Sequence, residues 1–225
     1  MGKLMNRVAL VTGAGTGLGR AIAIAFANEG ATVVLTGRRE GKLREVEREI
    51  GNGKAIVIPA DLTDETAVRA LRDELLSSTN GKLDILVNNA GGVSAMNSIS
   101  ELTLEQWKQM MDLNLTSQFL ATKAFLPTLR KSENGKILSI TSGMANFYMN
   151  GFGAYSSSKA GVEALMKTVA AEEKENGIQV NLFVPINVIS EGNLNGEKDP
   201  AEIVAAIIEL ATANSIEKSG EVVKP

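Results

Sequence analysis

The chain has 225 residues, 44% of them hydrophobic, and a formal net charge of −3, as expected for one globular domain. The mild charge and the lack of a basic tract argue against a nucleic-acid partner, and no apolar run is long enough to cross a bilayer. The first six residues lack the apolar stretch of a signal peptide, so we expect a cytoplasmic protein. Cysteine and histidine are absent, which excludes disulfides, thiolate nucleophiles, Ser-His-Asp triads and nearly all zinc sites, and we expect no metal.

Short runs of aliphatic residues alternate with longer helical patterns along the whole chain. Strands are predicted at 8–11, 32–35, 55–58, 85–87, 137–141, 178–183 and 221–223, and helices at 17–29, 40–50, 64–77, 103–130, 154–175 and 200–213. Continuous apolar strands separated by helices indicate a parallel sheet covered on both faces. We therefore expect one α/β domain over residues 1–225, a doubly wound Rossmann fold with a mostly parallel sheet of about seven strands.

Capping residues support these helix boundaries. Thr103 and Gln106 form a capping-box pattern, and Pro200 stands where a missing N–H costs little. Gly30 and Gly177 follow predicted helices as C-terminal stops.

A glycine-rich loop, Thr12-Gly13-Ala14-Gly15-Thr16-Gly17-Leu18-Gly19, joins the first strand to the first helix. The common G-x-G-x-x-G spacing is not met, because Leu18 and Arg20 occupy the last position of its two possible frames. Missing Cβ atoms still let the backbone approach a phosphate, which the helix N-terminus attracts. We expect the loop to bind the pyrophosphate of a dinucleotide rather than to be a ligand-free turn. The expected contact residues are Gly13, Thr16, Gly17, Leu18 and Gly19.

Three ordered motifs resemble the short-chain dehydrogenase/reductase family over nearly the whole chain. They are Thr12-Gly13-x-x-x-Gly17-x-Gly19, Asn88-Asn89-Ala90-Gly91 and Tyr155-x-x-x-Lys159. The resemblance is strongest to 3-oxoacyl-carrier-protein reductases. It implies a small-molecule carbonyl substrate, with an acyl-carrier-bound one as an alternative, and a homodimer or homotetramer formed through helices 103–130 and 154–175. It also places Asn88, Ala90 and Gly91 near the adenosine ribose. These residues would serve as much to join neighbouring strands as to contact the cofactor.

The residues after the second strand favour NADP as the cofactor. NAD enzymes usually carry an acid there, whereas this chain has Gly37 followed by Arg38 and Arg39. Arg38 offers a planar fork to a 2′-phosphate, although the arginines could simply solvate a helix start. Asp61 and Leu62 resemble the adenine contact of the family, and Asp61 is equally consistent with a helix-turn residue.

The predicted reacting centre lies on the helix that begins near residue 154. Tyr155 and Lys159 share one helix face, so a nearby ammonium should lower the pKa of the phenol and suit it to exchange a proton with a carbonyl oxygen. The resemblance implies that Tyr155 and Lys159 also contact the cofactor, Lys159 at the nicotinamide ribose, and that Ser142 hydrogen-bonds the substrate carbonyl. It further implies that Asn114 holds a water connected to Lys159. The alternative for Ser142 is an ordinary turn hydroxyl, and the alternative for Asn114 is a buried helix amide.

The segment after the sixth strand departs from the family pattern. The chain reads Pro185-Ile186-Asn187-Val188-Ile189-Ser190, where Ile186 replaces a flexible glycine and Ser190 stands in for the usual threonine. Pro185, Val188 and Ser190 are expected to contact the nicotinamide, and the following 191–199 segment is short for a lid.

An apolar group lies in the loop before Tyr155. Met144, Phe147, Met149 and Phe152 could line a substrate pocket or pack in the core or a subunit interface.

The leading hypothesis is NADPH-dependent reduction of a ketone or aldehyde. A sugar or other alcohol dehydrogenase is the nearest enzyme alternative. A non-catalytic NADP-binding sensor or scaffold is the alternative from another class.

Overall fold

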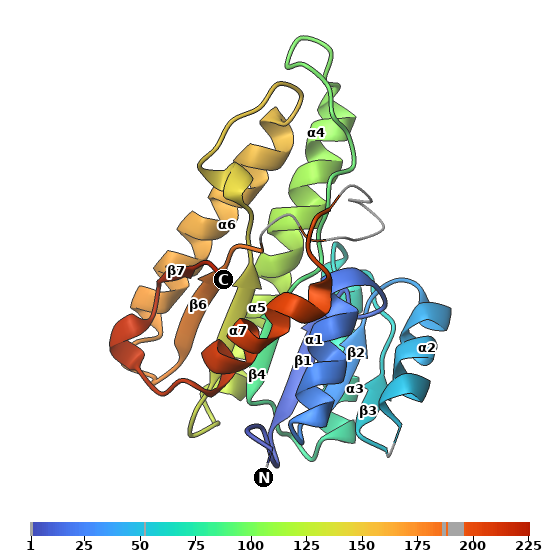
Figure 1. Ribbon diagram of the computed structural model, residues 1–225, viewed down its shortest axis with the longest axis vertical. Helices are drawn as coiled ribbons and strands as arrows, with labels where there is room; N and C mark the ends of the chain where they lie inside the picture. Colours follow the sequence, from blue (N-terminus) through green and yellow to red (C-terminus); the bar gives the residue numbers. More distant parts are fainter. Residues whose placement is uncertain (1, 52, 186–187, 189–195) are drawn as a thin grey trace.

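The computed structural model describes residues 2–51, 53–185, 188 and 196–225. One seven-stranded sheet crosses the molecule in the order β3-β2-β1-β4-β5-β6-β7, and every neighbouring pair is parallel (Figure 1). The strands are β1 (Val8–Thr12), β2 (Thr32–Thr36), β3 (Ala55–Val57), β4 (Ile85–Asn88), β5 (Lys136–Ile140), β6 (Gln179–Phe183) and β7 (Val222–Val223). The predicted doubly wound fold is confirmed.

Helices cover both faces of this sheet. They are α1 (Gly17–Asn28), α2 (Glu40–Ile50), α3 (Glu65–Ser78), α4 (Leu104–Met111), α5 (Ser117–Leu129), α6 (Gly153–Glu172) and α7 (Pro200–Thr212), with short turns η1 (Asp112–Thr116), η2 (Gly143–Ala145) and η3 (Ile216–Lys218). The capping box at Thr103 is present, and Pro200 is the first residue of α7. Gly30 and Gly177 follow their helices with positive φ, as a C-terminal stop requires.

Two hydrophobic cores lie on opposite faces because successive strand residues point to opposite sides. Ala9 and Val11 of β1 face the core made with α1, α2 and α7. Val8 and Leu10 face the core made with α3, α5 and α6. The strands are therefore apolar at consecutive positions, which is why they contain continuous hydrophobic runs.

The predicted helix 103–130 is interrupted. Its middle turn, Asp112–Thr116, is a π-helix that separates α4 from α5. A π-turn inserts one extra residue per turn and is often found at functional sites. Hydrophobic periodicity predicted a single helix here because the apolar pattern continues across the interruption. Asn114 lies in the centre of this turn and is fully buried.

The sheet order reverses between β1 and β4. The chain runs outward from β1 through β2 to β3, then returns to place β4 on the other side of β1. In open parallel sheets the loops at the carboxyl ends of such a pair diverge and leave a crevice for a ligand. The fold therefore places the loops after β1 and β4 on either side of a binding crevice.

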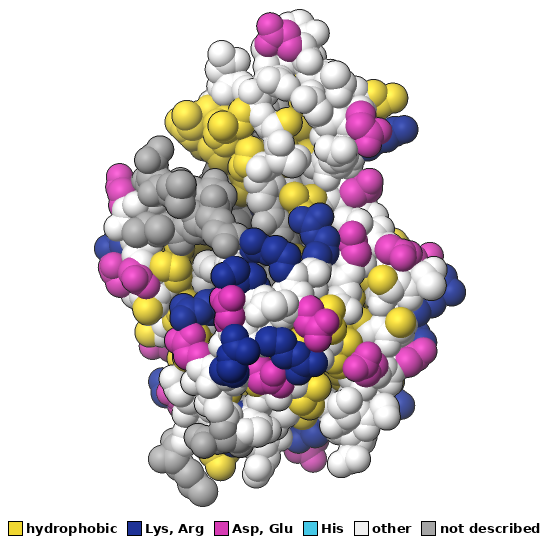
Figure 2. Space-filling model, turned by 90° about the vertical axis from the view of Figure 1, so that its right-hand side faces the viewer, with side chains coloured by type: hydrophobic (Ala, Val, Ile, Leu, Met, Phe, Trp, Pro, Cys, Tyr) yellow, Lys and Arg dark blue, Asp and Glu magenta, His cyan; other side chains and the backbone are white. Residues whose placement is uncertain are grey.

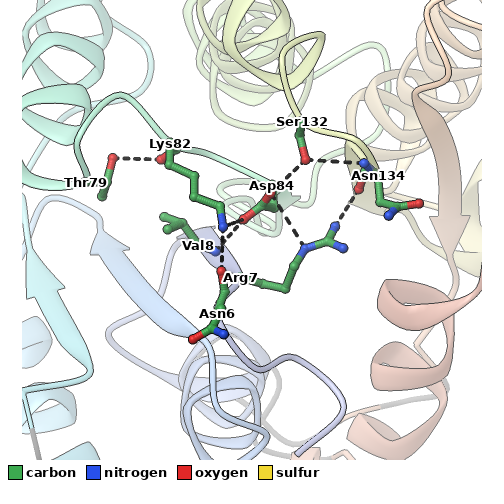
Figure 3. A network of polar contacts seen from close by, with 8 residues as sticks. All are labelled: Asn6, Arg7, Val8, Thr79, Lys82, Asp84, Ser132 and Asn134. Carbon is green, nitrogen blue, oxygen red and sulfur yellow. Dashed lines mark hydrogen bonds and ion pairs between the residues drawn. The ribbon is translucent and has the colours of Figure 1, made fainter.

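At the opposite, amino-terminal ends of the central strands, a polar network surrounds Asp84, just before β4 (Figure 3). Its carboxylate accepts hydrogen bonds from the Val8 backbone N–H at 2.8 Å and the Ser132 hydroxyl at 2.7 Å. The Arg7 Nε and Lys82 Nζ atoms lie 3.8 and 3.5 Å from its oxygens. Asp84 thus ties the starts of β1 and β4 to the loop before β5.

We predict that Asp84→Ala lowers the free energy of unfolding by roughly 3 kcal/mol, because it leaves a buried N–H and two cations without their carboxylate. Urea unfolding measures the change. Asp73→Ala removes an acid that is 67% exposed and paired with Arg72, and this control should change stability by less than about 0.5 kcal/mol. Equal effects of the two substitutions would contradict a structural role for the network.

Candidate active site

The glycine loop between β1 and α1 has no room for side chains at its tightest point. A Cβ atom on Gly19 would lie 2.3 Å from the Gly13 carbonyl oxygen and 2.4 Å from Asn89 Nδ2. Gly13 and Gly17 have φ values of +65° and +53°, which favour glycine. α1 begins at Gly17, and the Thr16 side chain makes no capping hydrogen bond to it. The first N–H groups of α1 are therefore free to bind an anion at the loop.

This loop is fastened to the loop after β4. The Thr12 hydroxyl oxygen accepts hydrogen bonds from the backbone N–H groups of Asn89 and Ala90, both at 2.9 Å. The Asn89 side chain donates back to the Thr12 carbonyl at 2.8 Å. Asn89 was not among the residues predicted to bind the cofactor, although its place in the Asn88-Asn89-Ala90-Gly91 motif was a signal.

A cleft of about 850 Å³ opens between these loops and receives most of the predicted site residues. Those that line it are Gly13, Thr16, Gly17, Leu18, Gly19, Arg38, Asp61, Leu62, Ala90, Gly91, Ser142, Tyr155, Lys159, Pro185 and Val188. Asn88 and Asn114 are not among its lining residues. The predictions for Ile186 and Ser190 lie outside the described residues.

Asn88 has a structural environment instead. Its buried side chain donates to the Thr122 hydroxyl at 3.0 Å and to the Ser139 hydroxyl at 3.4 Å, joining β4 to α5 and β5. These contacts agree with the structural half of its predicted role.

One end of the cleft is rich in cations. Arg38, Arg39 and Lys42 line it after β2, and Figure 2 shows basic side chains gathered in the middle of this face, below a hydrophobic group. Arg39 Nη2 donates to the Thr16 hydroxyl at 3.3 Å. Lys42 was missed from the sequence, because only the fold brings the first turn of α2 to the cleft.

Asp61 lies at the same end, after β3. Backbone and hydroxyl hydrogen bonds from Thr63, at 3.0 and 2.8 Å, lower the pKa of its carboxyl group, and the Arg38 charge adds to this effect. Asp61 is therefore an ionised hydrogen-bond acceptor at neutral pH. Its hydrogen bonds to Thr63 match the predicted turn residue, and its place in the lining of the cleft leaves the predicted adenine contact as a proposal.

α6 carries the candidate reacting groups on one face. Lys159 is buried, its Nζ atom donates to the Ile140 carbonyl at 3.2 Å, and it lies 5.8 Å from the centroid of the Tyr155 ring. Burial lowers the pKa of Lys159 to about 8. Burial also raises the pKa of Tyr155, and a hydrogen bond with Ser142 partly offsets this rise. The expectation of a lowered phenol pKa is wrong for this structure, because loss of solvent outweighs the stabilisation of phenolate.

Ser142 follows β5 and begins the short turn η2. Its hydroxyl accepts a hydrogen bond from the Met144 N–H at 3.2 Å and also bonds Tyr155. Ser142 and Tyr155 therefore lie in the same part of the cleft, whereas Ser139 is buried against Asn88.

Glu163 was not identified from the sequence. It is buried on α6, and its carboxylate accepts from the Thr141 hydroxyl and from Asn146 Nδ2, both at 3.3 Å. These two residues flank the turn that carries Ser142. Glu163 stands four residues after Lys159, so the same helix face that holds the tyrosine and lysine also fixes the serine turn.

Asn114 binds the backbone of the β4 loop. Its Nδ2 donates to the Gly92 carbonyl at 2.8 Å, and its Oδ1 accepts from the Gly92 N–H at 2.9 Å. A Cβ atom on Gly91 would lie 2.6 Å from Asn114 Oδ1 and 3.4 Å from Lys159 Nζ. Asn114 is thus both the buried helix amide of the alternative interpretation and a neighbour of Lys159.

The apolar candidates divide into two groups. Met144 and Phe152 line the cleft, together with Val93 and Met96, and the Phe152 ring meets Tyr155 edge-on at 6.3 Å. Phe147 and Met149 are exposed at 62% and 54% and are not lining residues.

Within the described ranges, no three potential metal ligands come together. In the same ranges, the longest apolar helices fall short of what a membrane crossing requires.

Comparison with known proteins agrees with this geometry. The family model described as short chain dehydrogenase matches residues 7–200. A 3beta-hydroxysteroid dehydrogenase of Mediterraneibacter gnavus is 36% identical over 94% of this chain and 75% of its own. A 3-oxoacyl-[acyl-carrier-protein] reductase of Synechocystis is 36% identical over 94% of this chain and 92% of its own.

Solved structures share the whole fold. A short chain dehydrogenase of Shigella flexneri 2a strain 301, complexed with NADP, superimposes with a TM-score of 0.91 and 29% identity over 100% of this chain and 99% of its own. The chain belongs to the short-chain dehydrogenase/reductase family of oxidoreductases.

Proposed function

We propose that this protein reduces a ketone or aldehyde to an alcohol with NADPH. The observation that carries this proposal is one cleft lined by the glycine loop, the basic residues after β2 and the Ser142–Tyr155–Lys159 group. The missing Cβ atoms at Gly13 and Gly19 leave space for a pyrophosphate against the N-terminus of α1. The residues present therefore fit a nicotinamide dinucleotide.

When bound, the reduced nicotinamide supplies a hydride to the carbonyl carbon. The Tyr155 phenol gives its proton to the carbonyl oxygen as negative charge develops there. A raised pKa keeps that phenol protonated at neutral pH, which suits the reductive direction. Ser142 donates a hydrogen bond that orients the same oxygen. Lys159 would bind the nicotinamide ribose, and Asn114 would support proton supply to Lys159.

The preference for NADP rests on charge. Gly37 offers no carboxylate to repel a 2′-phosphate, and Arg38, Arg39 and Lys42 line the cleft beside it. Asp61 and Leu62 of the same end would contact the adenine, while Ala90, Gly91, Pro185 and Val188 would contact the rest of the cofactor. The NADP complex of the Shigella relative is consistent with this preference.

Several substrates fit the family. A 3-oxoacyl thioester follows from the Synechocystis relative, and a sugar or other alcohol remains the alternative. A non-catalytic NADP-binding scaffold is less consistent with the site, because Ser142, Tyr155 and Lys159 all line the cleft, Ser142 is hydrogen-bonded to Tyr155, and Lys159 Nζ lies 5.8 Å from the centroid of the Tyr155 ring.

We also propose a cytoplasmic homodimer or homotetramer assembled through α4, α5 and α6. Leu104 of α4 and Phe119 of α5 are large hydrophobic residues left 68% and 43% exposed in the single chain. An interface over these helices would bury them.

Replacing Tyr155 by Phe removes the proton donor without changing the ring. We predict that kcat for NADPH-dependent ketone reduction falls at least about a hundredfold, since general acid catalysis contributes that much. The affinity for NADPH, measured by fluorescence titration, should stay unchanged. Tyr148→Phe is the control, because Tyr148 is 77% exposed and should be dispensable. Full turnover by the Tyr155 variant would place the proton donor elsewhere.

Arg38→Gln tests the choice of cofactor. We expect its Kd for NADPH to rise about tenfold or more, as loss of a charge-assisted phosphate contact implies, and its Kd for NADH to remain unchanged. Arg48→Gln changes an exposed arginine on α2 and serves as the control. Tighter binding of NADH than NADPH by the unmodified protein would refute the assignment of Arg38.

Gly19→Ala tests the phosphate loop. Its new Cβ would collide with the Gly13 carbonyl, so the loop must shift, and we predict at least a tenfold rise in the Kd for both NADPH and NADH, or roughly 1.4 kcal/mol. Gly41→Ala, at a helical position with no atom within 4 Å, should bind both cofactors normally. Circular dichroism checks that both variants fold. Unaltered cofactor affinity in a folded Gly19 variant would exclude this loop as the binding element.

A further inference from the structure

The two ends of the cleft differ in charge. Four of the charged residues that line it, Arg38, Arg39, Lys42 and Asp61, follow β2 and β3 at the end assigned to the adenosine. Lys159 is the remaining charged lining residue among those described, and it is buried with its Nζ bonded to the Ile140 carbonyl. The opposite end, beside Tyr155, is lined by Val93, Met96, Met144 and Phe152, which we call the apolar end.

Two segments without Asp, Glu, Lys or Arg build the apolar end. Residues 89–100 and 137–158 contain no Asp, Glu, Lys or Arg. The two segments touch, since a Cβ atom on Gly153 would lie 2.5 Å from Ile99 Cδ1 and one on Gly151 would lie 3.6 Å from the Met96 backbone. Among the described lining residues, the buried Lys159 is therefore the one cation close to the reacting groups, and its Nζ is already bonded to the Ile140 carbonyl.

The lack of acidic and basic side chains at the apolar end favours some carbonyl substrates over others. A carboxylate or phosphate brought beside Tyr155 would lose water without gaining a partner charge, which is strongly unfavourable. A sugar would leave several hydroxyl groups against methionine and phenylalanine side chains. An apolar body would instead exchange water for contact with Met96, Met144 and Phe152, and methionine adapts to irregular shapes.

We propose that the substrate is an uncharged carbonyl compound with an apolar body. Its carbonyl oxygen meets Tyr155 and Ser142, and its body lies against the apolar end. This inference rests on the proposed function, because it concerns the substrate of that same site.

A matched pair of ketones tests it: ethyl acetoacetate is neutral, and acetoacetate is the corresponding anion. With NADPH and the unmodified protein, kcat/KM should be at least about a hundredfold higher for the ester, because the anion enters without a counter-charge. Trans-1-decalone, a bulky apolar ketone, should be reduced, and glucose should not be oxidised with NADP. Preferential turnover of acetoacetate or glucose would overturn the inference and leave the proposed function standing. No turnover of any compound by protein that binds NADPH would overturn both.

A charge placed at the apolar end gives a second, independent readout. In Met96→Lys, kcat/KM for acetoacetate should rise about fivefold, the effect of one partly exposed ion pair, while that for ethyl acetoacetate falls. Met149→Lys is the matched control, since Met149 belongs to the charge-free segment 137–158 without lining the cleft and is 54% exposed. If both lysine variants keep the selectivity of the unmodified protein, the apolar end is not the substrate-binding region.

Discussion

The close approach of the loops after β1 and β4 is the constraint on which the site depends. Gly13, Gly19 and Asn89 pack so tightly that a single added Cβ would overlap backbone or amide atoms. The contact exists because β1 and β4 are neighbours in the sheet while their connections leave in opposite directions. Hydrogen bonds between Thr12 and the Asn89–Ala90 backbone hold it in place. The glycines thus serve both the packing of two loops and access to the N-terminus of α1.

Burial on α6 shifts the pKa values of Tyr155 and Lys159 in opposite directions. It raises the pKa of Tyr155 and lowers that of Lys159 to about 8, since in each case loss of water favours the neutral form. At neutral pH both groups are still protonated, so each can donate a proton or a hydrogen bond. Glu163, one turn farther along, is the carboxylate that holds the Ser142 turn from both sides. One helix face therefore fixes the Tyr155 phenol, the neighbouring Lys159 cation and the Ser142 hydroxyl relative to one another.

The sequence was most informative where a short pattern of residues is compatible with only one local structure. Alternating apolar runs and helical patterns predicted every strand that the structure describes, and Gly13, Gly17 and Gly19 predicted the tight turn between β1 and α1, because few conformations suit those residues. Lys42 and Glu163 could not be assigned in this way. Each has an ordinary local environment in sequence, and each reaches the site only through the packing of elements distant in the chain. The direction of the Tyr155 pKa was missed for the same reason, since it depends on burial and not on helical spacing. Asn89 differs, because it belongs to the Asn88-Asn89-Ala90-Gly91 motif and was nevertheless left out of the predicted contacts.

The π-turn at Asp112–Thr116 contacts the loop after β4, which borders both the glycine loop and the apolar end. It buries Asn114 where both of its amide atoms bind the Gly92 backbone. Gly92 lies two residues after Ala90, whose N–H is bonded to the Thr12 hydroxyl. The same loop continues to Val93 and Met96 at the apolar end. A regular α-helix lacks the extra residue of the π-turn, so its Asn114 side chain would be rotated about the helix axis, away from the Gly92 backbone. Loss of that clamp would free a segment whose beginning packs against the phosphate loop and whose end contacts the proposed substrate. Under the proposed function, one stretch of backbone therefore borders both the cofactor and the substrate, and a displacement of that stretch would alter the positions of both.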